Sequence, residues 1–342
     1  MCQCKLALFV VAIAASWTPA GAQVKVHYIN VGQASSALLE FPSGAILIDA
    51  GGEETGDTTD RDHLTGYLDR FFAQRTDLGK TLASVIISHP HIDHTRHLMD
   101  VMQRYSVKAL IDGGDDRGSG RAPLIAARQF ARSHRIKHMA IREGRIGAKG
   151  RTNRTIDPFP GDPDIRILSG FRRCQDKNND SLAVLVTVAQ ARLLFTGDGE
   201  FDEDDACEPL IPLLVRRYRK SRLLDADMYS VGHHGSRNGT SRELLEAVTP
   251  RIAVISAGHH SRRDPDEFHA FQFGHPRKVA VDLLDQFTTD RRPQPKEVYS
   301  MPKVAQVENR TMEKAVYCTC WDGDIVVSVN AQGVIERVET SQ

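Results

Sequence analysis

The 342-residue sequence has no net charge, because 44 Lys and Arg residues balance 44 Asp and Glu residues. This balance excludes a uniformly basic protein of the kind that coats nucleic acid. Beyond the first 22 residues, no apolar run approaches the ~20 residues that a membrane-spanning helix needs. No segment rich in Pro, Gly or Ser divides the chain into two independent domains. The remaining composition, 41% hydrophobic and 26% charged, is that of an ordinary globular protein.

Cysteine is scarce, and none of the six residues forms a Cys-x-x-Cys pair, which argues against a zinc cluster built from thiolates. Four cysteines lie in the body of the chain: Cys174, Cys207, Cys318 and Cys320. An oxidising compartment would allow disulfides among them, and the sequence leaves the pairing open. Cys318 and Cys320 are two residues apart on a predicted strand, so they face the same side, either pairing elsewhere or packing as thiols.

Residues 1–22 predict a secretory signal peptide. Lys5 precedes an apolar run of ten residues, Leu6 to Ala15, and Ala20-Gly21-Ala22 fits a cleavage site before Gln23. Ten apolar residues are too few to span a bilayer, and a buried core segment is the weaker alternative. We therefore expect residues 23–342 to be exported to the periplasm or secreted, without stable membrane insertion.

The body of the chain alternates short apolar runs with helical patterns. Strands are predicted at residues 24–30, 36–40, 45–49, 82–88, 107–112, 165–168, 182–188, 191–195, 227–231, 251–256 and within 315–329. Helices are predicted at 62–74 and 95–105, and after a capping box at residues 240–243, the last ending at Pro250. This order predicts one α/β domain over residues 23–342, with two sheets stacked face to face and helices outside.

The strongest chemical signal is His89-Pro90-His91-Ile92-Asp93-His94, which directly follows a predicted apolar strand. His89 and His91 are two residues apart, so in an extended loop both imidazoles point the same way and can share an ion. Asp93 and His94 then turn toward a second position. Imidazole and carboxylate groups suit Zn²⁺, with Mn²⁺ or iron as alternatives.

This HxHxDH pattern resembles that of the metallo-β-lactamase superfamily, and other segments resemble it in the same order. Asp49 in Leu47-Ile48-Asp49-Ala50-Gly51 is similar to the family's buried acid that supports a metal ligand. Asp198 in Thr196-Gly197-Asp198 resembles the carboxylate that bridges two metals, and Gly232-His233-His234-Gly235-Ser236 resembles the last histidine motif. The resemblance implies a four-layer αββα sandwich with two divalent ions at one edge of the sheets.

A closer resemblance is to the hydrolase domain of ComEC-type competence proteins. It is carried by the segments Asn30-Val31-Gly32-Gln33, Asn178-Asn179-Asp180-Ser181-Leu182, Gly232 to Ser236, Val254-Ile255-Ser256-Ala257-Gly258 and Gly274-His275-Pro276. Together they cover nearly all of residues 23–342. The long membrane-channel part of ComEC is absent from this sequence, which puts a role in DNA transport in doubt but leaves the hydrolytic site.

Two departures from the superfamily pattern bear on the site. Arg96-His97 stands where a glycine pair often follows HxHxDH. The third histidine often supplied to the first metal is also missing before Leu182, where Asn179 or Asp180 stands instead. An oxygen ligand or a water would then complete that metal, which leaves room for manganese.

The resemblance implies a set of six metal ligands: His89, His91, Asp93, His94, Asp198 and His233. Within the pair His233 and His234, we take His233 as the ligand and His234 as a substrate contact or proton donor. A purely structural role for His234 and the reverse assignment of the two residues both stay open. Two bound divalent ions, Zn²⁺ first and Mn²⁺ as the alternative, would share a hydroxide as nucleophile. Asp93, Asp198 and His234 are the expected catalytic residues.

Further residues are candidates for supporting the ligands or binding substrate: Asp49, Asn179, Asp180, Ser236 and His275. Ser236 either binds an anion or only forms a turn. His275 stands at an expected helix start, where it either caps a surface helix or lies near a phosphate that the helix N-terminus attracts. Residues 117–154 hold eleven Lys or Arg residues and one acid, which indicates either a solvated surface or a rim that attracts an anionic substrate.

We therefore expect an exported binuclear metal hydrolase that cleaves phosphodiester bonds in a small molecule or a nucleic acid. The first alternative is an enzyme of the same fold that hydrolyses a carboxyl ester, a lactone or a β-lactam. The second is a binding module without catalysis, which the missing third histidine would favour and the six retained ligands disfavour. The sequence leaves the oligomeric state open.

Overall fold

The computed structural model describes residues 24–53, 59–161, 163–261 and 269–342, which contain two large mixed sheets flanked by helices. The predicted signal peptide at residues 1–22 lies outside the described residues. Within the described ranges, no helix is both long enough and apolar enough to cross a membrane.

The first sheet contains eight strands in the order β18-β17-β1-β2-β3-β5-β7-β8. Neighbours from β18 to β3 pair antiparallel, whereas β3, β5, β7 and β8 run parallel. Their bounds are β1 Val24–Tyr28, β2 Ala37–Phe41, β3 Gly44–Ile48, β5 Ser84–Ile86, β7 Ala109–Asp112, β8 Lys137–Ala140, β17 Ile325–Val329 and β18 Ile335–Thr340.

The second sheet contains six strands in the order β16-β13-β12-β11-β10-β9. Strands β11, β12, β13 and β16 run parallel, and β9 and β10 complete the sheet antiparallel. Their bounds are β9 Asp164–Ile167, β10 Val184–Val188, β11 Ala191–Phe195, β12 Met228–Ser230, β13 Ile252–Ile255 and β16 Val316–Cys318. The parallel strands of both sheets end at the same edge, where the functional loops lie.

Three apolar clusters show how the strands are sandwiched. In β3, Ile46 and Ile48 belong to the central cluster between the sheets, whereas Ala45 and Leu47 belong to a cluster on the outer face. Strand β13 alternates in the same way between the central cluster and that on the outer face of the second sheet. Because successive side chains of a strand point to opposite faces, each sheet is apolar on both sides and needs a helical cover.

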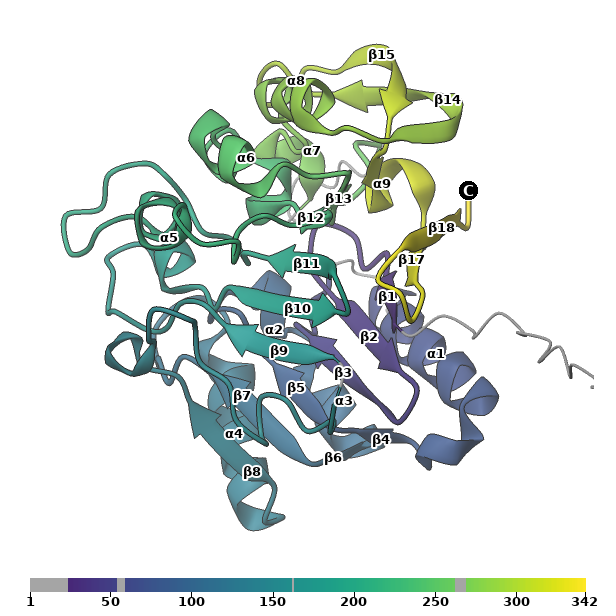
Figure 1. Ribbon diagram of the computed structural model, residues 1–342. Helices are drawn as coiled ribbons and strands as arrows, with labels where there is room; N and C mark the ends of the chain where they lie inside the picture. The colour runs from purple at the N-terminus through teal and green to yellow at the C-terminus, as the bar shows by residue number, and fades with distance from the viewer. Residues whose placement is uncertain (1–23, 54–58, 162, 262–268) are drawn as a thin grey trace, which may run out of the picture.

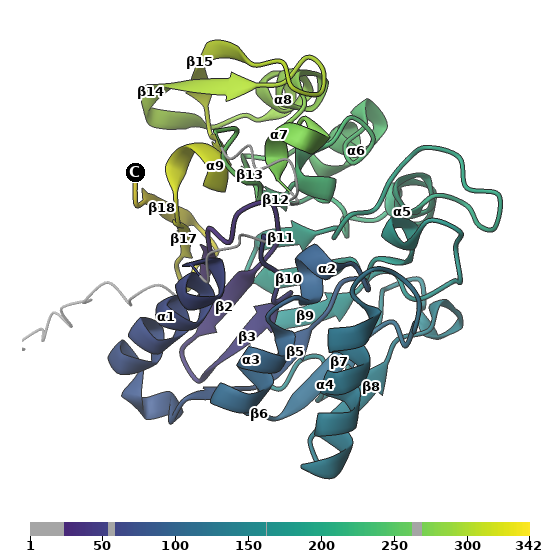
Figure 2. The same ribbon diagram turned by 180° about the vertical axis from the view of Figure 1, so that it is seen from behind.

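Helices α1, α3 and α4 cover the outer face of the first sheet, and α5, α6 and α8 cover that of the second (Figure 1 and, from behind, Figure 2). The helices are α1 Thr59–Gln74, α2 Ile92–Thr95, α3 Leu98–Arg104, α4 Arg121–Ser133, α5 Leu210–Tyr218, α6 Arg242–Val248, α7 Ala270–Phe273, α8 Lys278–Phe287 and α9 Thr319–Asp322. The expected four-layer αββα sandwich is therefore confirmed.

The remaining elements are four strands outside the two large sheets and four 3₁₀ turns. They are β4 Thr81–Leu82, β6 Ser106–Val107, β14 Arg291–Ser300, β15 Glu308–Lys314, η1 Thr76–Leu78, η2 Glu143–Arg145, η3 Lys177–Asp180 and η4 Gly232–Gly235. The hairpin of β14 and β15 lies beside α8 (Figure 1).

Several local predictions need correction. The cap of α6 is Ser241, whose Oγ accepts from Leu244 N, and not Thr240. Cys318 and Cys320 form a disulfide with each other, because the chain turns into α9 after Cys318 instead of continuing as a strand. The other disulfide joins Cys174 to Cys207.

Candidate metal centre

Strand ends from both sheets bring the site residues together. Asp49 follows β3, and the HxHxDH segment follows β5 and enters α2 at its N-cap, His91. Asp198 follows β11, and the turn η4 follows β12. Because β3 and β5 belong to the first sheet and β11 and β12 to the second, the site lies where the two sheets meet at one edge.

Four of these side chains form a compact buried group, with one ligand atom from each lying within 4.8 Å of the others: Asp93, His94, Asp198 and His234. Asp198 Oδ2 lies 3.1 Å from His94 Nε2 and 3.3 Å from His234 Nε2. Asp93 Oδ2 lies 3.1 Å from His234 Nε2. Two carboxylates and two imidazoles that converge in this way provide the donor set that a divalent transition metal prefers.

The Nδ1 atoms of His94 and His234, which face away from the carboxylates of Asp93 and Asp198, each have an acceptor. His94 Nδ1 lies 2.7 Å from Asp49 Oδ2, and His234 Nδ1 lies 2.8 Å from the carbonyl oxygen of Ser256. A carbonyl can only accept, so His234 Nδ1 carries a proton and Nε2 is directed at the carboxylates. Metal-binding histidines are oriented by this kind of second contact, so the residues fit a metal site.

Asp49 also orients the neighbouring loop. Its Oδ1 accepts from Ser88 N at 2.7 Å and its Oδ2 accepts from Ser88 Oγ at 2.8 Å. Asp49 adopts a φ of 59°, which Asp tolerates better than most residues. The carboxylate therefore contacts the ligand loop through three hydrogen bonds.

The first two histidines of the motif border this group. His89 Nε2 lies 3.0 Å from His91 Nδ1 and 3.8 Å from Asp198 Oδ2. His89 is buried, whereas His91 is partly exposed. The two imidazole nitrogens therefore face each other next to the four-residue group, on the side of the Asp198 carboxylate.

The carboxylates and imidazoles of the group stabilise each other's charged forms. Burial alone would raise the pKa of Asp198, but the imidazoles of His94 and His234 hold this pKa well below its usual range. Burial would lower the pKa of His94, but the carboxylates raise it well above its usual value, and they raise the pKa of His234 to about 10. His89 differs, because burial and the nearby His94 lower its pKa well below the usual value.

The adjacent histidines of η4 point in different directions. Both His233 and His234 have positive φ, 50° and 53°, so the backbone turns sharply between them. His234 joins the buried group, whereas His233 Nδ1 lies 2.9 Å from Glu200 Oε1. The structure thus places the metal-facing nitrogen on His234, in the arrangement that the sequence left open, and not on His233.

Neither Asn179 nor Asp180 belongs to the buried four-residue group. Asn179 Oδ1 accepts from Glu200 N and Leu210 N at 3.2 and 2.9 Å. Asp180 Oδ1 accepts from the backbone amides of Arg172 and Arg173 at 2.8 and 2.9 Å. These oxygens hold loops together in the described structure.

Ser236 and His275 have structural contacts. Ser236 Oγ lies 2.7 Å from Asn238 Oδ1 and accepts from Gly239 N, so it stabilises the turn. His275 is buried and its Nδ1 lies 2.8 Å from Gln33 Nε2. It precedes α8 by three residues, with Arg277 as the helix cap, so the expected helix start at His275 is wrong.

Asn178 and Glu200 were not predicted as site residues. Asn178 is 6% exposed, donates from Nδ2 to Glu200 Oε1 at 2.8 Å, and lines a groove together with His91. Its Oδ1 is buried without a hydrogen-bond partner among the described residues. This oxygen is a candidate for the ligand that replaces the missing histidine. The sequence pointed to this segment, because it indicated the neighbouring Asn179 or Asp180 for that position.

Gly51 allows the ligand loop to approach β3. A Cβ at this position would lie 1.7 Å from the carbonyl oxygen of Asp93. Gly51 N donates to Ser35 O at 3.0 Å, which fixes the same segment from the other side. A larger residue would therefore displace the backbone that carries Asp93.

The two-sheet sandwich and the His/Asp group at its edge are typical of a metal-dependent hydrolase fold. The family model of the metallo-beta-lactamase superfamily matches residues 29–259. The chain therefore belongs to the metallo-β-lactamase superfamily, as its motifs indicated.

Among proteins of known name, the chain is similar to two bacterial proteins. It is 25% identical over 275 residues to ComE operon protein 3 of Bacillus subtilis, covering 77% of this chain and 30% of that protein. It is 24% identical over 258 residues to Recombination protein 2 of Haemophilus influenzae, covering 75% of this chain and 27% of that protein. The chain thus spans less than a third of the length of either relative, and the predicted resemblance to ComEC-type proteins is confirmed.

Among solved structures, the chain is similar to the metallo-beta-lactamase fold protein YhfI from Bacillus subtilis. The two are 13% identical with a TM-score of 0.44, and the match covers 84% of this chain and 99% of that one.

Proposed function

We propose that this protein is an exported, binuclear metal-dependent phosphodiesterase that acts on small substrates. The observation that carries the proposal is the convergence of Asp93, His94, Asp198 and His234 from two sheets, with His89 and His91 beside them. The relatives are similar over most of this chain, which supports a ComEC-like hydrolytic site.

The residues divide into two ligand groups that share Asp198. Asp93, His94 and His234 would hold one divalent cation, and His89, His91 and the Asn178 oxygen the other, with Zn²⁺ as the first choice and Mn²⁺ as the alternative. Such cations, when bound, lower the pKa of water toward ~7 and polarise a phosphoryl oxygen. Asp49 and Ser256 keep the imidazoles in the orientation that this binding needs.

His233 is the histidine of η4 that a substrate can contact. Its side chain keeps 21% of its surface exposed, whereas that of His234 keeps 3%. Glu200 holds its Nδ1, so the ring orientation is fixed at the border of the buried group. We therefore assign the substrate contact, and the donation of a proton to the leaving oxygen, to His233 and not to His234.

The surroundings of His91 favour a small substrate over a polymer. A groove of about 600 Å³ beside His91 is lined by Asp176, Glu203, Asp204 and Asp205. Its one basic residue, Lys177, directs Nζ to the carbonyl oxygens of Cys174 and Gln175. A row of carboxylates repels the successive phosphates of a nucleic acid, whereas a single phosphodiester meets mainly the cations.

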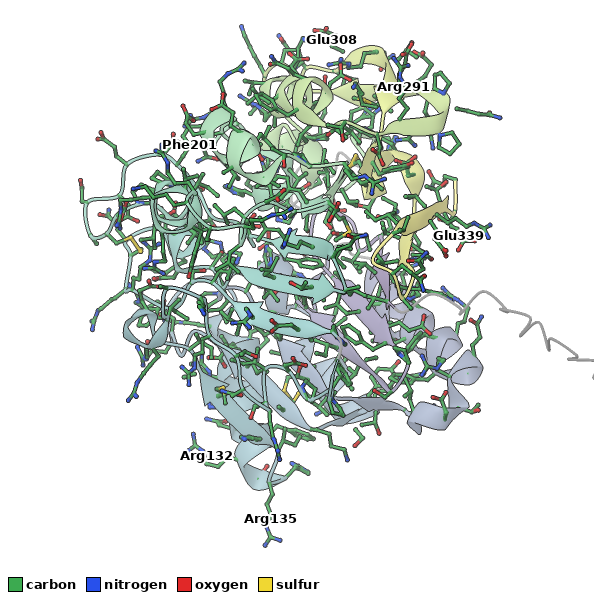
Figure 3. The ribbon with its side chains drawn as sticks, viewed as in Figure 1. Arg132, Arg135, Phe201, Arg291, Glu308 and Glu339 are labelled. Atoms are coloured by element: carbon green, nitrogen blue, oxygen red, sulfur yellow. A yellow bond between two sulfur atoms is a disulfide. The ribbon has the colours of Figure 1, made fainter. Side chains whose placement is uncertain are left out.

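The start of the basic stretch at residues 117–154 touches the ligand loop. Ser119 and Gly120 contact the ligand loop through Ile92 N and the Pro90 carbonyl. Helix α4 then leads away over about 20 Å, and Arg132 and Arg135 lie at its far end (Figure 3). The cations at the far end of α4 are therefore too distant to draw substrate to the metals.

A substrate panel tests the proposal. The metal-replete protein is expected to hydrolyse bis(p-nitrophenyl) phosphate with Zn²⁺ or Mn²⁺, faster than single-stranded DNA or RNA, and Asp198→Asn is expected to abolish this activity. Folded, metal-replete protein that turns over none of the phosphodiesters would refute it. Faster hydrolysis of nitrocefin or a lactone would favour the alternative hydrolase, and a protein that binds no transition metal would favour a binding module.

A further inference from the structure

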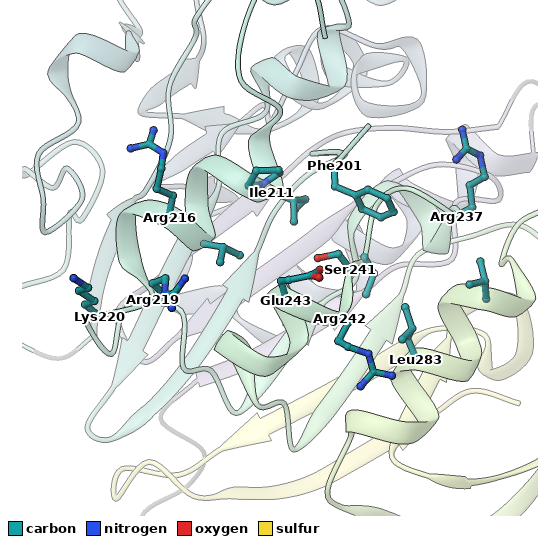
Figure 4. Close-up of a pocket in the computed structure, with 14 residues that line it drawn as sticks. Phe201, Ile211, Arg216, Arg219, Lys220, Arg237, Ser241, Arg242, Glu243 and Leu283 are labelled. Carbon is teal, nitrogen blue, oxygen red and sulfur yellow. The ribbon is translucent and has the colours of Figure 1, made fainter. Parts of the chain in front are cut away.

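A groove separate from the metal centre lies between α5, α6 and α8, with a volume of about 980 Å³ (Figure 4). Its apolar lining comes from Phe201, Ile211, Pro212, Val215, Val279 and Leu283. Val279 on α8 is 50% exposed, so it adds apolar surface that solvent and a ligand can reach. A concave apolar surface of this size matches the pockets that hold small ligands.

Basic side chains surround this apolar surface: Arg216, Arg219, Lys220, Arg237 and Arg242. In Figure 4, Arg216, Arg219 and Lys220 gather at one end of the groove, and Arg237 lies at the opposite end. Glu243 is the one acidic residue of the lining. The lining therefore combines an excess of positive charge with an apolar floor.

Helix electrostatics explain only part of this charge. The last turn of α5 favours basic residues, because a helix C-terminus is partly negative. Arg242, however, occupies the first turn of α6, where a basic residue is unfavourable, and Arg237 lies on a loop. Cations from three separate segments thus face one groove.

The cations differ in how far they are neutralised. Arg216 pairs with Glu208, Arg237 with Asp202, and Arg242 contacts Gln286 Oε1 at 3.0 Å. Arg219 and Lys220 are exposed and form no ion pair with the described part of the chain. The end of the groove at these two residues therefore offers uncompensated positive charge next to apolar surface.

We propose that this groove binds a single-chain anionic amphiphile. The anionic head lies at Arg219 and Lys220, and the hydrocarbon chain lies along Ile211, Val215 and Leu283. This charge and this apolar floor fit a carboxylate or phosphate head that carries an alkyl chain. Phe201 and Arg237 belong to the same segments as Asp198 and His234, three residues away, but the groove uses none of the metal-facing side chains.

Calorimetric titration of the full chain with dodecanoate, without added metal and below the concentration at which micelles form, tests this proposal. One saturable site per chain is expected. Arg219→Gln with Lys220→Gln is expected to weaken binding at least about fivefold, because two exposed ion pairs are lost. Val279→Asp is expected to weaken it as well, and Glu243→Gln to strengthen it, because the one carboxylate of the lining is removed.

Matched controls separate this site from general cation effects. Arg132→Gln with Arg135→Gln removes two exposed cations from the far end of the molecule (Figure 3) and is expected to leave binding unchanged. Dodecyl maltoside, which has the same chain and no charge, is expected to bind regardless of the Arg219 and Lys220 substitutions. Absence of saturable dodecanoate binding, or equal losses in both double variants, would overturn the proposal. Because no metal or turnover is involved, this result is independent of the phosphodiesterase proposal.

Discussion

Asp49→Asn is expected to weaken metal binding while leaving the fold intact. The carboxylate accepts three hydrogen bonds, from Ser88 N, Ser88 Oγ and His94 Nδ1. An amide has one oxygen, so it can satisfy only one side of this arrangement. The backbone conformation with φ of 59° is tolerated by Asn, so the substitution tests the hydrogen bonds and not the turn.

Each orientation of the new amide has a cost at the site. If its oxygen faces His94, its NH₂ group opposes Ser88 N–H and leaves a buried donor unsatisfied, which costs about 1–3 kcal/mol. If the amide is reversed, its NH₂ group faces His94 Nδ1 and favours the tautomer with a proton on Nε2, the nitrogen that faces the metal position. Loss of such a supporting contact weakens metal binding about 10- to 100-fold, which corresponds to about 1.4–2.8 kcal/mol.

Competition with a chromogenic chelator measures this change, with Asp322→Asn as a matched control. Asp322 is also a buried carboxylate, but it pairs with Arg292 and Lys296 of β14, which are not residues of the metal centre. Its substitution is expected to lower the free energy of unfolding without changing metal affinity. Wild-type metal affinity in folded Asp49→Asn protein would refute the supporting role of Asp49.

Three further predictions follow from particular contacts. His234→Ala is expected to remove bound metal that His233→Ala retains, because His234 Nε2 faces Asp93 and Asp198 whereas His233 faces Glu200; elemental analysis of both variants showing equal metal content would contradict this placement. Burial would raise the pKa of Glu40, but its contacts with His27 and Arg75 lower this pKa from 4.5 to about 2. These contacts therefore add about 2 kcal/mol to the free energy of unfolding above pH 4.5, and this contribution is lost as the pH falls toward 2. Urea unfolding should therefore show a smaller loss of stability between pH 6 and pH 3 in Glu40→Gln than in the wild type, and parallel losses would count against the contact. Replacing Cys174 and Cys207 by Ser is expected to cost about 3–4 kcal/mol of unfolding free energy, against about 1 kcal/mol for Cys318 and Cys320, because the disulfides close loops of 33 and 2 residues; similar losses in non-reducing urea titrations would contradict this ranking.

The fold could be predicted because its information is local. Each inner strand is a short apolar run that alternates between two buried faces, as in β3 and β13, and such runs are visible in one sequence. The HxHxDH segment also lies immediately after a strand, so its position at a sheet edge followed from the strand alone. By contrast, α4 and α5 were not predicted, since each has a proline in its first turn, where proline is tolerated but interrupts the apolar pattern.

The site details that the sequence left unresolved depend on backbone geometry and distant partners. His233 and His234 both adopt positive φ, and this backbone turn decides which of the two faces the metal position. The residue type His does not predict such a conformation. The roles of Asn179 and Asp180 depend on amides of residues 172, 173, 200 and 210, which reach them only in the folded chain. Asn178 differs from Asn179 in having an unpartnered buried oxygen, which a sequence cannot show.

The two-sheet origin of the ligand group links metal binding to the closure of the sandwich. Asp93 and His94 follow a strand of the first sheet, whereas Asp198 and His234 follow strands of the second. Their carboxylates lie buried within 3.1–3.3 Å of imidazole nitrogens, an arrangement that needs positive charge to be stable. Protons on the histidines can supply that charge only while their raised pKa values keep them protonated, whereas a divalent cation supplies it independently of those protons. A cation bound here therefore joins the edges of both sheets, and its binding free energy adds to the stability of the folded state.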